Sequence, residues 1–406
     1  MKKIFTVLVI LTVWVSASAV DMQAHMGTKE AQEAYSLYLN KQSSYYTGNY
    51  SYAQLCTLSG NDLFGALNAL MGNTCNNGKS GFSYGNLRYA YKNVDKDLNI
   101  SGNIIGYYDG ATFSSTWDQG KTWNREHTWP QSKFKGSYSN GTSIPIGYDM
   151  QSVRPALTAQ NSDRGNAAYG ESGSYYDPNE ISINNSLYVS TNLGSYRGDA
   201  ARVILYDYIV YGKWGSYSNY LYDSNVNADL LTQVGTNSNS VFESIPVLLK
   251  WHMNDPVSLT EMVRNDGAQD YQGNRNPFID YPELAIEMLK NASGMKTYNV
   301  TVEGAPMWPN YRLTQNSGFI AYMGTKDKRP ESVTVTGATY TYDKNNGRLI
   351  IKNVSGNMTI SSVWDETTDG FEGVYEAPKA YKTIYNGQVV IIREGKKYNI
   401  MGQVVE

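Results

Sequence analysis

The strongest constraint on the fold is a change in the spacing of apolar residues near Gly294. Before this position apolar residues recur every three or four places, which predicts helices, and after it apolar and polar residues alternate, which predicts strands. The predicted helices cover residues 31–39, 61–71, 198–214, 241–253 and 282–289. A chain with these two spacing patterns is expected to have an α+β fold, with a large mixed domain over residues 20–293 followed by a small all-β module.

The predicted β module spans residues 294–365 and contains four alternating segments. These segments cover residues 298–302, 332–342, 348–354 and 358–363, with a hairpin turn at 343–347. The module has almost no candidate catalytic residues, so we interpret it as a spacer or a binding accessory. Residues 366–381 are expected to form a linker. The C-terminal tail, 382–406, shows a short hairpin pattern that resembles the sorting tails of some Gram-negative secreted proteins, although a terminal hairpin packed on the β module explains it equally well.

The first 19 residues have the pattern of a signal peptide. Lys2 and Lys3 precede an apolar run from Ile4 to Val15, and small residues end at Ala19. The apolar run is shorter than the ~20 residues that span a bilayer, so a membrane anchor is disfavoured. We therefore expect a protein without a transmembrane anchor that is secreted to the periplasm, the cell surface or the medium of a Gram-negative bacterium.

Two cysteines, Cys56 and Cys75, are the only ones in the chain. Export would place them in an oxidising compartment, where a bridge across so short a loop adds roughly 3 kcal/mol to stability. A structural disulfide is therefore expected. A catalytic thiol is the alternative, but no histidine lies near either cysteine in the sequence.

The charge distribution is uneven although the formal net charge is only −3. Between Lys121 and Arg164 six basic residues face three acidic ones, which is compatible with a local basic groove for nucleic acid. The 35 tyrosines, together with many Asn, Ser and Gly, suit an extracellular surface and also carbohydrate contact. Composition alone does not decide between these partners.

Three histidines are present, and His127 has the most suggestive neighbour, Glu126. Hydrolysis of a phosphodiester needs a base that activates water and a cation that neutralises developing charge. Glu126 offers a hard oxygen to Mg²⁺ and His127 offers the base, yet neighbours on a strand point to opposite faces, so a distortion or a strand end is required. Downstream, Pro155 is placed to begin a short helix that carries Asn161, whose amide oxygen would complete a sparse Mg²⁺ shell.

These residues also lie in a series of motifs, and each has an ordinary alternative explanation. The motifs are REHTWP at 125–130, DMQSVRPA at 149–156 and NSDRGN at 161–166, followed by DPVS at 255–258, EMVRN at 261–265 and GNRNPFID at 273–280. Asp149 and Asn166 would serve equally well in turns, and Arg154 and Arg164 in ion pairs. In combination and in this order, the motifs resemble the endonuclease I family of secreted bacterial nucleases, over roughly residues 31–290.

The resemblance implies a ββα-metal, or His-Me finger, core and a secreted, metal-dependent endonuclease. Such an enzyme would cut DNA, RNA or both, and would function as a monomer with Mg²⁺, or else Mn²⁺ or Ca²⁺. Motif by motif, the base falls on His127 and the metal ligands on Glu126 and Asn161. Arg164 and Asn166 match a recurring Arg and Asn of the family, which implies shaping of the helix and contact with phosphate.

Two positions depart from the family pattern. Gln151 stands where the family often has a histidine, and the arginine that stabilises the leaving group has no clear match. Lys133, Lys135 and Arg154 are the candidates for that role, and the two lysines are also candidate substrate contacts. Arg275, which lies among Gly and Asn in a predicted loop, is equally compatible with a phosphate contact and a structural role.

Two other functions remain open from the sequence. A non-catalytic surface protein would bind a glycan or another polymer through its tyrosines and its β module, and a phosphodiesterase of smaller esters would share the same site. No element for reading bases is evident, so the nuclease hypothesis predicts little sequence preference.

Overall fold

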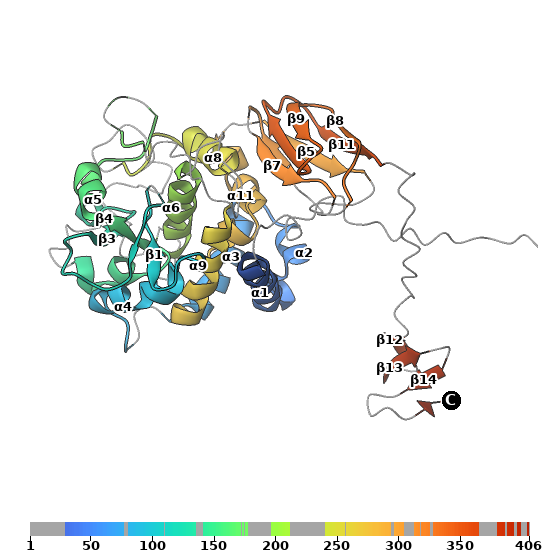
Figure 1. The fold of residues 1–406 in the computed structure, drawn as a ribbon, viewed down its shortest axis with the longest axis horizontal. Helices are drawn as coiled ribbons and strands as arrows, with labels where there is room; N and C mark the ends of the chain where they lie inside the picture. Colours follow the sequence, from blue (N-terminus) through green and yellow to red (C-terminus); the bar gives the residue numbers. More distant parts are fainter. Residues whose placement is uncertain are drawn as a thin grey trace, which may run out of the picture. The chain divides into compact units, whose positions relative to one another are not determined.

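The computed structural model describes most of the chain from Lys29 onward (Figure 1). It describes residues 29–364 except 77–79, 109, 135–140, 172, 174, 178–195, 212–239, 256, 294–295, 304–311, 317 and 325–327, and in the tail 380–385, 388–393, 396–398 and 404–405. The chain divides into two units, Met1–Val363 and Trp364–Glu406. The predicted signal peptide at 1–19 lies outside the described residues.

Helices form the body of the first unit (Figure 1). They are α1 (Lys29–Tyr45), α2 (Tyr52–Leu55), α3 (Gly60–Thr74), α4 (Tyr84–Val94), α5 (Thr158–Arg164), α6 (Arg197–Tyr211), α8 (Ile245–Asn254), α9 (Leu259–Gln272), α10 (Pro277–Asp280) and α11 (Glu283–Ser293). The five predicted helices are present, although α8 begins at Ile245 rather than at 241 and residues 212–214 lie outside the described residues. A further helix is predicted to open with Asp255 as its N-cap; that start is wrong, because Asp255 is the C-cap of α8 and α9 begins at Leu259 after the N-cap Ser258. Helix α6 is buried on every side and packs with α3, α8 and α10, so it forms the centre of the largest core. No helix in the described part of the chain is long and apolar enough to cross a membrane.

A ββα unit lies against this helical body. Strand β3 (Trp123–His127) pairs antiparallel with β4 (Val153–Leu157), with Glu126 opposite Arg154 and His127 opposite Val153. Helix α5 follows β4 without an intervening loop and packs back onto both strands. A second, smaller pair, β1 (Asn103–Ile105) and β2 (Thr112–Ser114), is also antiparallel. The mixture of helices with small sheets confirms the predicted α+β class and its ββα element.

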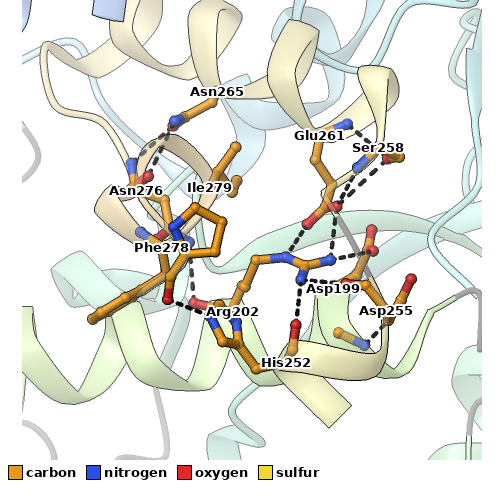
Figure 2. A network of polar contacts seen from close by, with 12 residues as sticks. Asp199, Arg202, His252, Asp255, Ser258, Glu261, Asn265, Asn276, Phe278 and Ile279 are labelled. Carbon is orange, nitrogen blue, oxygen red and sulfur yellow. Dashed lines mark hydrogen bonds and ion pairs between the residues drawn. The ribbon is translucent and has the colours of Figure 1, made fainter. Parts of the chain in front are cut away.

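A buried ion network joins three helices of this body (Figure 2). The Arg202 guanidinium, on α6, donates to both carboxylate oxygens of Glu261 on α9, at 2.6 and 2.8 Å. It also donates to the Asp255 carbonyl at the end of α8, at 2.7 Å, and lies 3.3 Å from the Asp199 carboxylate. Glu261 in turn completes a capping box with Ser258, which fixes the first turn of α9. The network therefore sets the relative positions of α6, α8 and α9.

The β module consists of two sheets in the same unit. One sheet has the order β7 (Phe319–Tyr322), β10 (Arg348–Lys352), β9 (Thr339–Asp343), and the other β6 (Arg312–Thr314), β5 (Thr297–Val302), β11 (Met358–Val363), β8 (Ser332–Val335). Their core includes Met253 from α8 and Ile286 from α11, so the module packs directly on the helical body.

One strand prediction in the β module is wrong. Residues 332–342 form two strands in different sheets, β8 and β9, rather than one. The break occurs at Gly337, which has a φ of 77°, a conformation that side-chain-bearing residues rarely adopt. A Cβ there would lie 2.4 Å from the Asn357 carbonyl oxygen, so the close approach of the two chain segments requires glycine.

The second unit is a small antiparallel sheet of its own. Its strands are β12 (Ala380–Tyr385), β13 (Gln388–Arg393), β14 (Lys396–Tyr398) and β15 (Val404–Val405) in sequential order. The predicted terminal hairpin corresponds to β12 and β13, and the sheet continues beyond it.

The predicted disulfide is absent from the structure, where Cys56 and Cys75 are not bonded to each other. Helix α3 explains the error, because its 15 residues separate the two cysteines and a helix rises about 1.5 Å per residue. Cys56 follows α2 and Cys75 follows the far end of α3, whereas a disulfide needs Cα atoms within about 7 Å.

Candidate active site

The two faces of strand β3 present different groups, as expected for neighbouring residues on a strand. Glu126 is buried against Tyr108 and Arg164, whereas the ring of His127 stacks on Tyr84 and meets the edge of Phe134. Adjacent residues such as Glu126 and His127 are expected to serve one site only at a distortion or at the end of a strand. His127 is the last residue of β3.

The His127 ring is held by a main-chain carbonyl. Its Nε2 lies 3.0 Å from the Gly147 oxygen, which can only accept a hydrogen bond. Nε2 therefore carries the ring proton in this contact, and Nδ1 keeps the lone pair. The carboxamide nitrogen of Gln131 lies 2.9 Å from Nε2 and 3.4 Å from Nδ1; since this nitrogen only donates, Nδ1 is the ring atom that can accept from it in this tautomer.

The electrostatic environment keeps this imidazole neutral. Burial lowers the pKa of His127 to about 4; the Gly147 hydrogen bond opposes this, and the positive charges of Arg125 and then Arg164 lower the pKa further by smaller amounts. An unprotonated histidine is the form that accepts a proton from water. His127 is therefore ready to act as a base at neutral pH.

Glu126 is almost fully buried, and one of its oxygens is fixed. Oε1 accepts hydrogen bonds from the Tyr108 hydroxyl at 2.6 Å and from Arg164 Nη1 at 2.7 Å. Burial raises the pKa of Glu126, and the Arg164 charge and the Tyr108 hydrogen bond oppose that rise. Oε2 accepts no hydrogen bond from any residue that the structure describes.

Asn161 lies in the middle of α5, and its side chain is on the same side of β3 as that of Glu126. Its Nδ2 donates to Asn124 Oδ1 at 2.6 Å, and Asn124 and Glu126 lie two residues apart on the strand. This orientation directs the amide oxygen of Asn161 away from that hydrogen bond. A carboxylate oxygen and an amide oxygen on one face fit Mg²⁺, which commonly takes one or two protein ligands and completes its shell with water and phosphate.

A denser metal site is not evident in the described residues, where no three His, Cys, Asp or Glu side chains are grouped to hold an ion. The pair Glu126 and Asn161 would thus bind a metal only in the sparse manner that suits Mg²⁺.

Arg164 is a positioning residue at the end of α5. Its Nη1 donates to Glu126 and to the His127 carbonyl at 2.9 Å, its Nη2 to the Thr128 carbonyl at 2.9 Å, and its Nε to the Ala167 carbonyl at 3.0 Å. The guanidinium is buried and fully engaged, so it locks α5 to the end of β3. The structure brings Arg164 to the site as predicted, beside both functional groups rather than facing solvent.

The other predicted residues take varied positions. Arg154 is buried, with ion pairs of 3.9 Å to both Asp95 and Asp199. Arg275 is fully buried and pairs with Asp266 and Asp280 at 2.7 Å, so it presents no surface to a phosphate. Their predicted catalytic and substrate-binding roles stay predictions that this burial does not favour.

Two of the remaining predicted contacts, Lys133 and Asn166, lie near the surface. Lys133 is partly buried and donates to the Ser240 carbonyl, and burial together with the Arg164 charge lowers its pKa to about 8. Asn166 is exposed and lies 3.4 Å from the Ser132 hydroxyl. Lys135 lies outside the described residues.

Two of the motif residues have structural roles. Asp149 is buried and accepts hydrogen bonds from Tyr206 at 2.8 Å and Gln272 at 2.7 Å. Gln151, which replaces a histidine of the family pattern, donates to Asn265 at 2.8 Å inside the protein. Sequence reasoning missed Tyr84, Tyr108 and Gly147, because each reaches the site from another element and none has a local signal.

Comparisons with known proteins agree with this geometry. A protein-family model described as Endonuclease I matches residues 63–283, which include the whole ββα unit. An extracellular ribonuclease of Bacillus amyloliquefaciens is 32% identical over 248 residues, covering 58% of this chain and 77% of the relative. An extracellular ribonuclease of Bacillus subtilis (strain 168) is 32% identical over 222 residues, covering 52% of this chain and 70% of the relative.

Proposed function

Because this chain belongs to the endonuclease I family, and is therefore a nuclease that acts on nucleic acid, we propose that it hydrolyses internal phosphodiester bonds of RNA, and of DNA, with Mg²⁺. The observation that carries the proposal is the arrangement at the end of β3, where Arg164 holds both the Glu126 carboxylate and the His127 carbonyl, next to a neutral His127 ring and the oxygens of Glu126 and Asn161. This arrangement combines a base for water with ligands for a hard cation.

His127 performs the proton transfer in this proposal. Its Nδ1 takes a proton from water while the water oxygen attacks phosphorus, and the bond between phosphorus and the leaving sugar oxygen breaks. The Gly147 carbonyl keeps the proton of the other ring nitrogen in place, which fixes the tautomer that the reaction needs. Arg164 holds the His127 carbonyl and the Glu126 carboxylate, and so maintains the spacing between base and ligand.

Glu126 Oε2 and Asn161 Oδ1 would hold the cation, which supplies positive charge to the phosphate when it is bound. The hydrogen bonds to Glu126 Oε1 and from Asn161 Nδ2 leave these two oxygens for that purpose. For the leaving group, Lys133 keeps a side chain with a pKa of about 8, which makes it the better of the described candidates.

RNA is the first proposed substrate because both relatives are described as extracellular ribonucleases. We extend to this chain both parts of that description, cleavage of RNA and export, and the predicted signal peptide supports the second. Low sequence preference follows from the lack of any base-reading element in the sequence.

The test is incubation of the purified protein with RNA and with plasmid DNA, each with Mg²⁺ and with a chelator. Replacement of Mg²⁺ by Mn²⁺ or Ca²⁺ defines the metal range. We expect RNA cleavage that requires the metal. Cleavage of the plasmid DNA under the same conditions shows whether the enzyme also accepts deoxyribose. Cleavage that persists in the chelator would refute the metal-dependent mechanism, and absence of cleavage of both polymers would refute the nuclease assignment for this chain.

A further inference from the structure

A row of alternating aromatic rings and guanidinium groups begins at His127 and continues along α4. We name it the stacking column, and it consists of Tyr84, Arg125, Trp117, Arg88 and Tyr89. It joins residues from α4, β3 and the segment after β2, so no single stretch of sequence reveals it.

The inner end of the column contacts the candidate base directly. The Tyr84 and His127 rings are stacked, with centroids 5.4 Å apart and planes inclined by 23°. The Arg125 guanidinium lies 3.7 Å from the centre of the Tyr84 ring, on which it is further fixed by a hydrogen bond of 2.8 Å to the Tyr84 carbonyl. The column therefore starts at the reacting group itself.

The outer end reaches solvent. Arg125 also lies 4.8 Å from the Trp117 ring, and Arg88 lies between Trp117, at 5.8 Å, and Tyr89, at 4.8 Å. Tyr89 ends the row with 59% of its surface exposed. These distances are within the range of cation–π attraction, so the rings and the guanidinium groups hold one another in place.

The two arginines of the column carry charge that the protein does not neutralise. Neither Arg88 nor Arg125 forms an ion pair with a carboxylate in the described part of the chain, and the Nε of each lacks a hydrogen-bond partner there. The other arginines described in the helical body all pair with carboxylates; these are Arg154, Arg164, Arg197, Arg202, Arg264 and Arg275. The column is thus a place where rings and unpaired positive charge coincide.

Rings interleaved with cations match the chemistry of unpaired nucleotides. Each exposed base has a flat face that stacks on an aromatic ring or a guanidinium plane, and each linking phosphate is attracted by the positive charge. In a duplex the base faces are already covered by neighbouring bases. We propose that the stacking column binds unpaired bases of a single-stranded nucleic acid beside the phosphate at His127, an inference that rests on the proposed nuclease function.

The proposal predicts a preference that one side chain controls. Tyr89→Ala should lower kcat/KM for a single-stranded oligonucleotide by about 5-fold or more, the loss of at least one stacked base. Cleavage of the duplex of the same sequence should change far less, because its bases cannot reach the ring. Tyr89→Trp, which keeps a ring, should retain the preference for the single strand.

Lys92→Ala is the matched control, because Lys92 lies exposed on the same helix and its loss removes a charge but no ring. It should leave the ratio of single-strand to duplex cleavage unchanged. Cleavage of single-stranded RNA and of single-stranded DNA should both fall in Tyr89→Ala, since every base offers a face for stacking. If only RNA cleavage fell, the effect would be assigned to the 2′-hydroxyl, which would contradict base stacking as the cause.

A binding measurement separates this proposal from the nuclease function. The affinity of a fluorescent single strand, measured in a chelator so that no cleavage occurs, should fall about 5-fold or more in Tyr89→Ala and hold in Lys92→Ala. Equal affinity of the wild type and Tyr89→Ala, or equal loss of single-strand and duplex cleavage, overturns the column as a base-binding site. If the wild type cuts neither polymer, the proposed function fails, and the binding result still decides the column.

Discussion

His127, the proposed base, illustrates how the surroundings of one residue set its protonation state and orientation. In water a histidine is half protonated near pH 6.5, and as a cation it has no lone pair to accept a proton. Here burial and two nearby arginines lower its pKa to about 4, and the Gly147 carbonyl selects the tautomer. The residue is therefore neutral and oriented before any substrate binds, which is the state that a general base requires.

The proposed metal ligands make a residue-level prediction. Asn161→Ala removes an amide oxygen, so the Mg²⁺ concentration for half-maximal cleavage should rise about 10-fold or more. Glu126→Gln should do the same, because a glutamine keeps the contacts of Tyr108 and Arg164 while removing the negative charge. The measurement is a Mg²⁺ titration of the cleavage rate.

Ser162→Ala is the control for this titration, since Ser162 is exposed on α5 next to Asn161 and its hydroxyl bonds only within the helix. It should show the wild-type Mg²⁺ requirement. An unchanged requirement in both Asn161→Ala and Glu126→Gln would show that the cation binds elsewhere.

Glu283 gives a prediction about stability and pH. It is buried beside the Tyr52 hydroxyl, and burial raises its pKa from about 4.5 to about 7. The folded state then binds a proton more tightly than the unfolded state, so stability is fully present below pH 4.5 and is lost as the pH rises through 7. The carboxyl should account for a fall of about 3 kcal/mol in unfolding free energy between these limits.

Glu283→Gln removes this titration while retaining a group that can accept the Tyr52 hydrogen bond. Urea unfolding at pH 5 and at pH 8 should show that the variant gains stability relative to the wild type at the higher pH. A difference between the two proteins that is the same at both pH values would contradict the raised pKa.

At the scale of elements, the ββα unit depends on the helices that support it. Helices α6, α8 and α9 are joined by the buried contacts of Arg202 (Figure 2). Removing one partner of a buried ion network leaves the others uncompensated, which costs about 3–5 kcal/mol. Arg202→Met should therefore lower the unfolding free energy by that amount, as measured by urea denaturation.

Arg197→Met is a useful comparison, because Arg197 forms its ion pairs with Asp177 and Glu171 at a quarter-exposed position on the same helix. Such pairs contribute about 0–1 kcal/mol. Equal losses in the two variants would show that burial of the Arg202 network does not determine its contribution.

Local patterns allowed the elements of the site to be predicted from sequence. Helical spacing identified the main helices, and Asn161 does lie on a short helix. The predicted start of that helix at Pro155 is wrong, because Pro155 lies within β4 opposite Arg125 and α5 begins at Thr158. The adjacency of Glu126 and His127 predicted that the pair needs a distortion or a strand end to serve one site, and His127 is the last residue of β3. Their chemical roles stay predictions, because metal binding and proton transfer are properties of the occupied site.

Contacts between distant elements could not be predicted in the same way. Arg275 lies among polar residues and looked like part of a surface loop, yet ion pairs with Asp266 and Asp280 bury it completely. The stacking column depends on contact between Tyr84, the first residue of α4, and the end of β3, and no spacing within α4 indicates that contact. The expected disulfide ignored the length of the helix between its two cysteines.

At the scale of the whole molecule, the chain divides after Val363 rather than at the start of the β module. The module shares its core with Met253 and Ile286, so it is part of the unit that contains the active site. A chain that ends after Val363 should keep the melting temperature and cleavage rate of the mature protein.

A chain that ends after Ser293 should behave differently. It would expose Met253 and Ile286, and loss of two buried apolar side chains lowers the unfolding free energy by about 3 kcal/mol or more. Thermal melting and urea unfolding of the two truncated proteins test whether the β module belongs to the same folding unit as the helical body. Equal stability of both would make the β module an independent domain, as its sequence had suggested.

The most direct test of the account is the cleavage of RNA by His127→Ala with Mg²⁺, with and without added imidazole. The loss of a general base should reduce the rate by about 10²-fold or more, while the melting temperature stays close to that of the wild type. Free imidazole should restore part of the rate, because it supplies the missing base to the cavity that the side chain vacates. A variant that cuts RNA at the wild-type rate would contradict the assignment of His127.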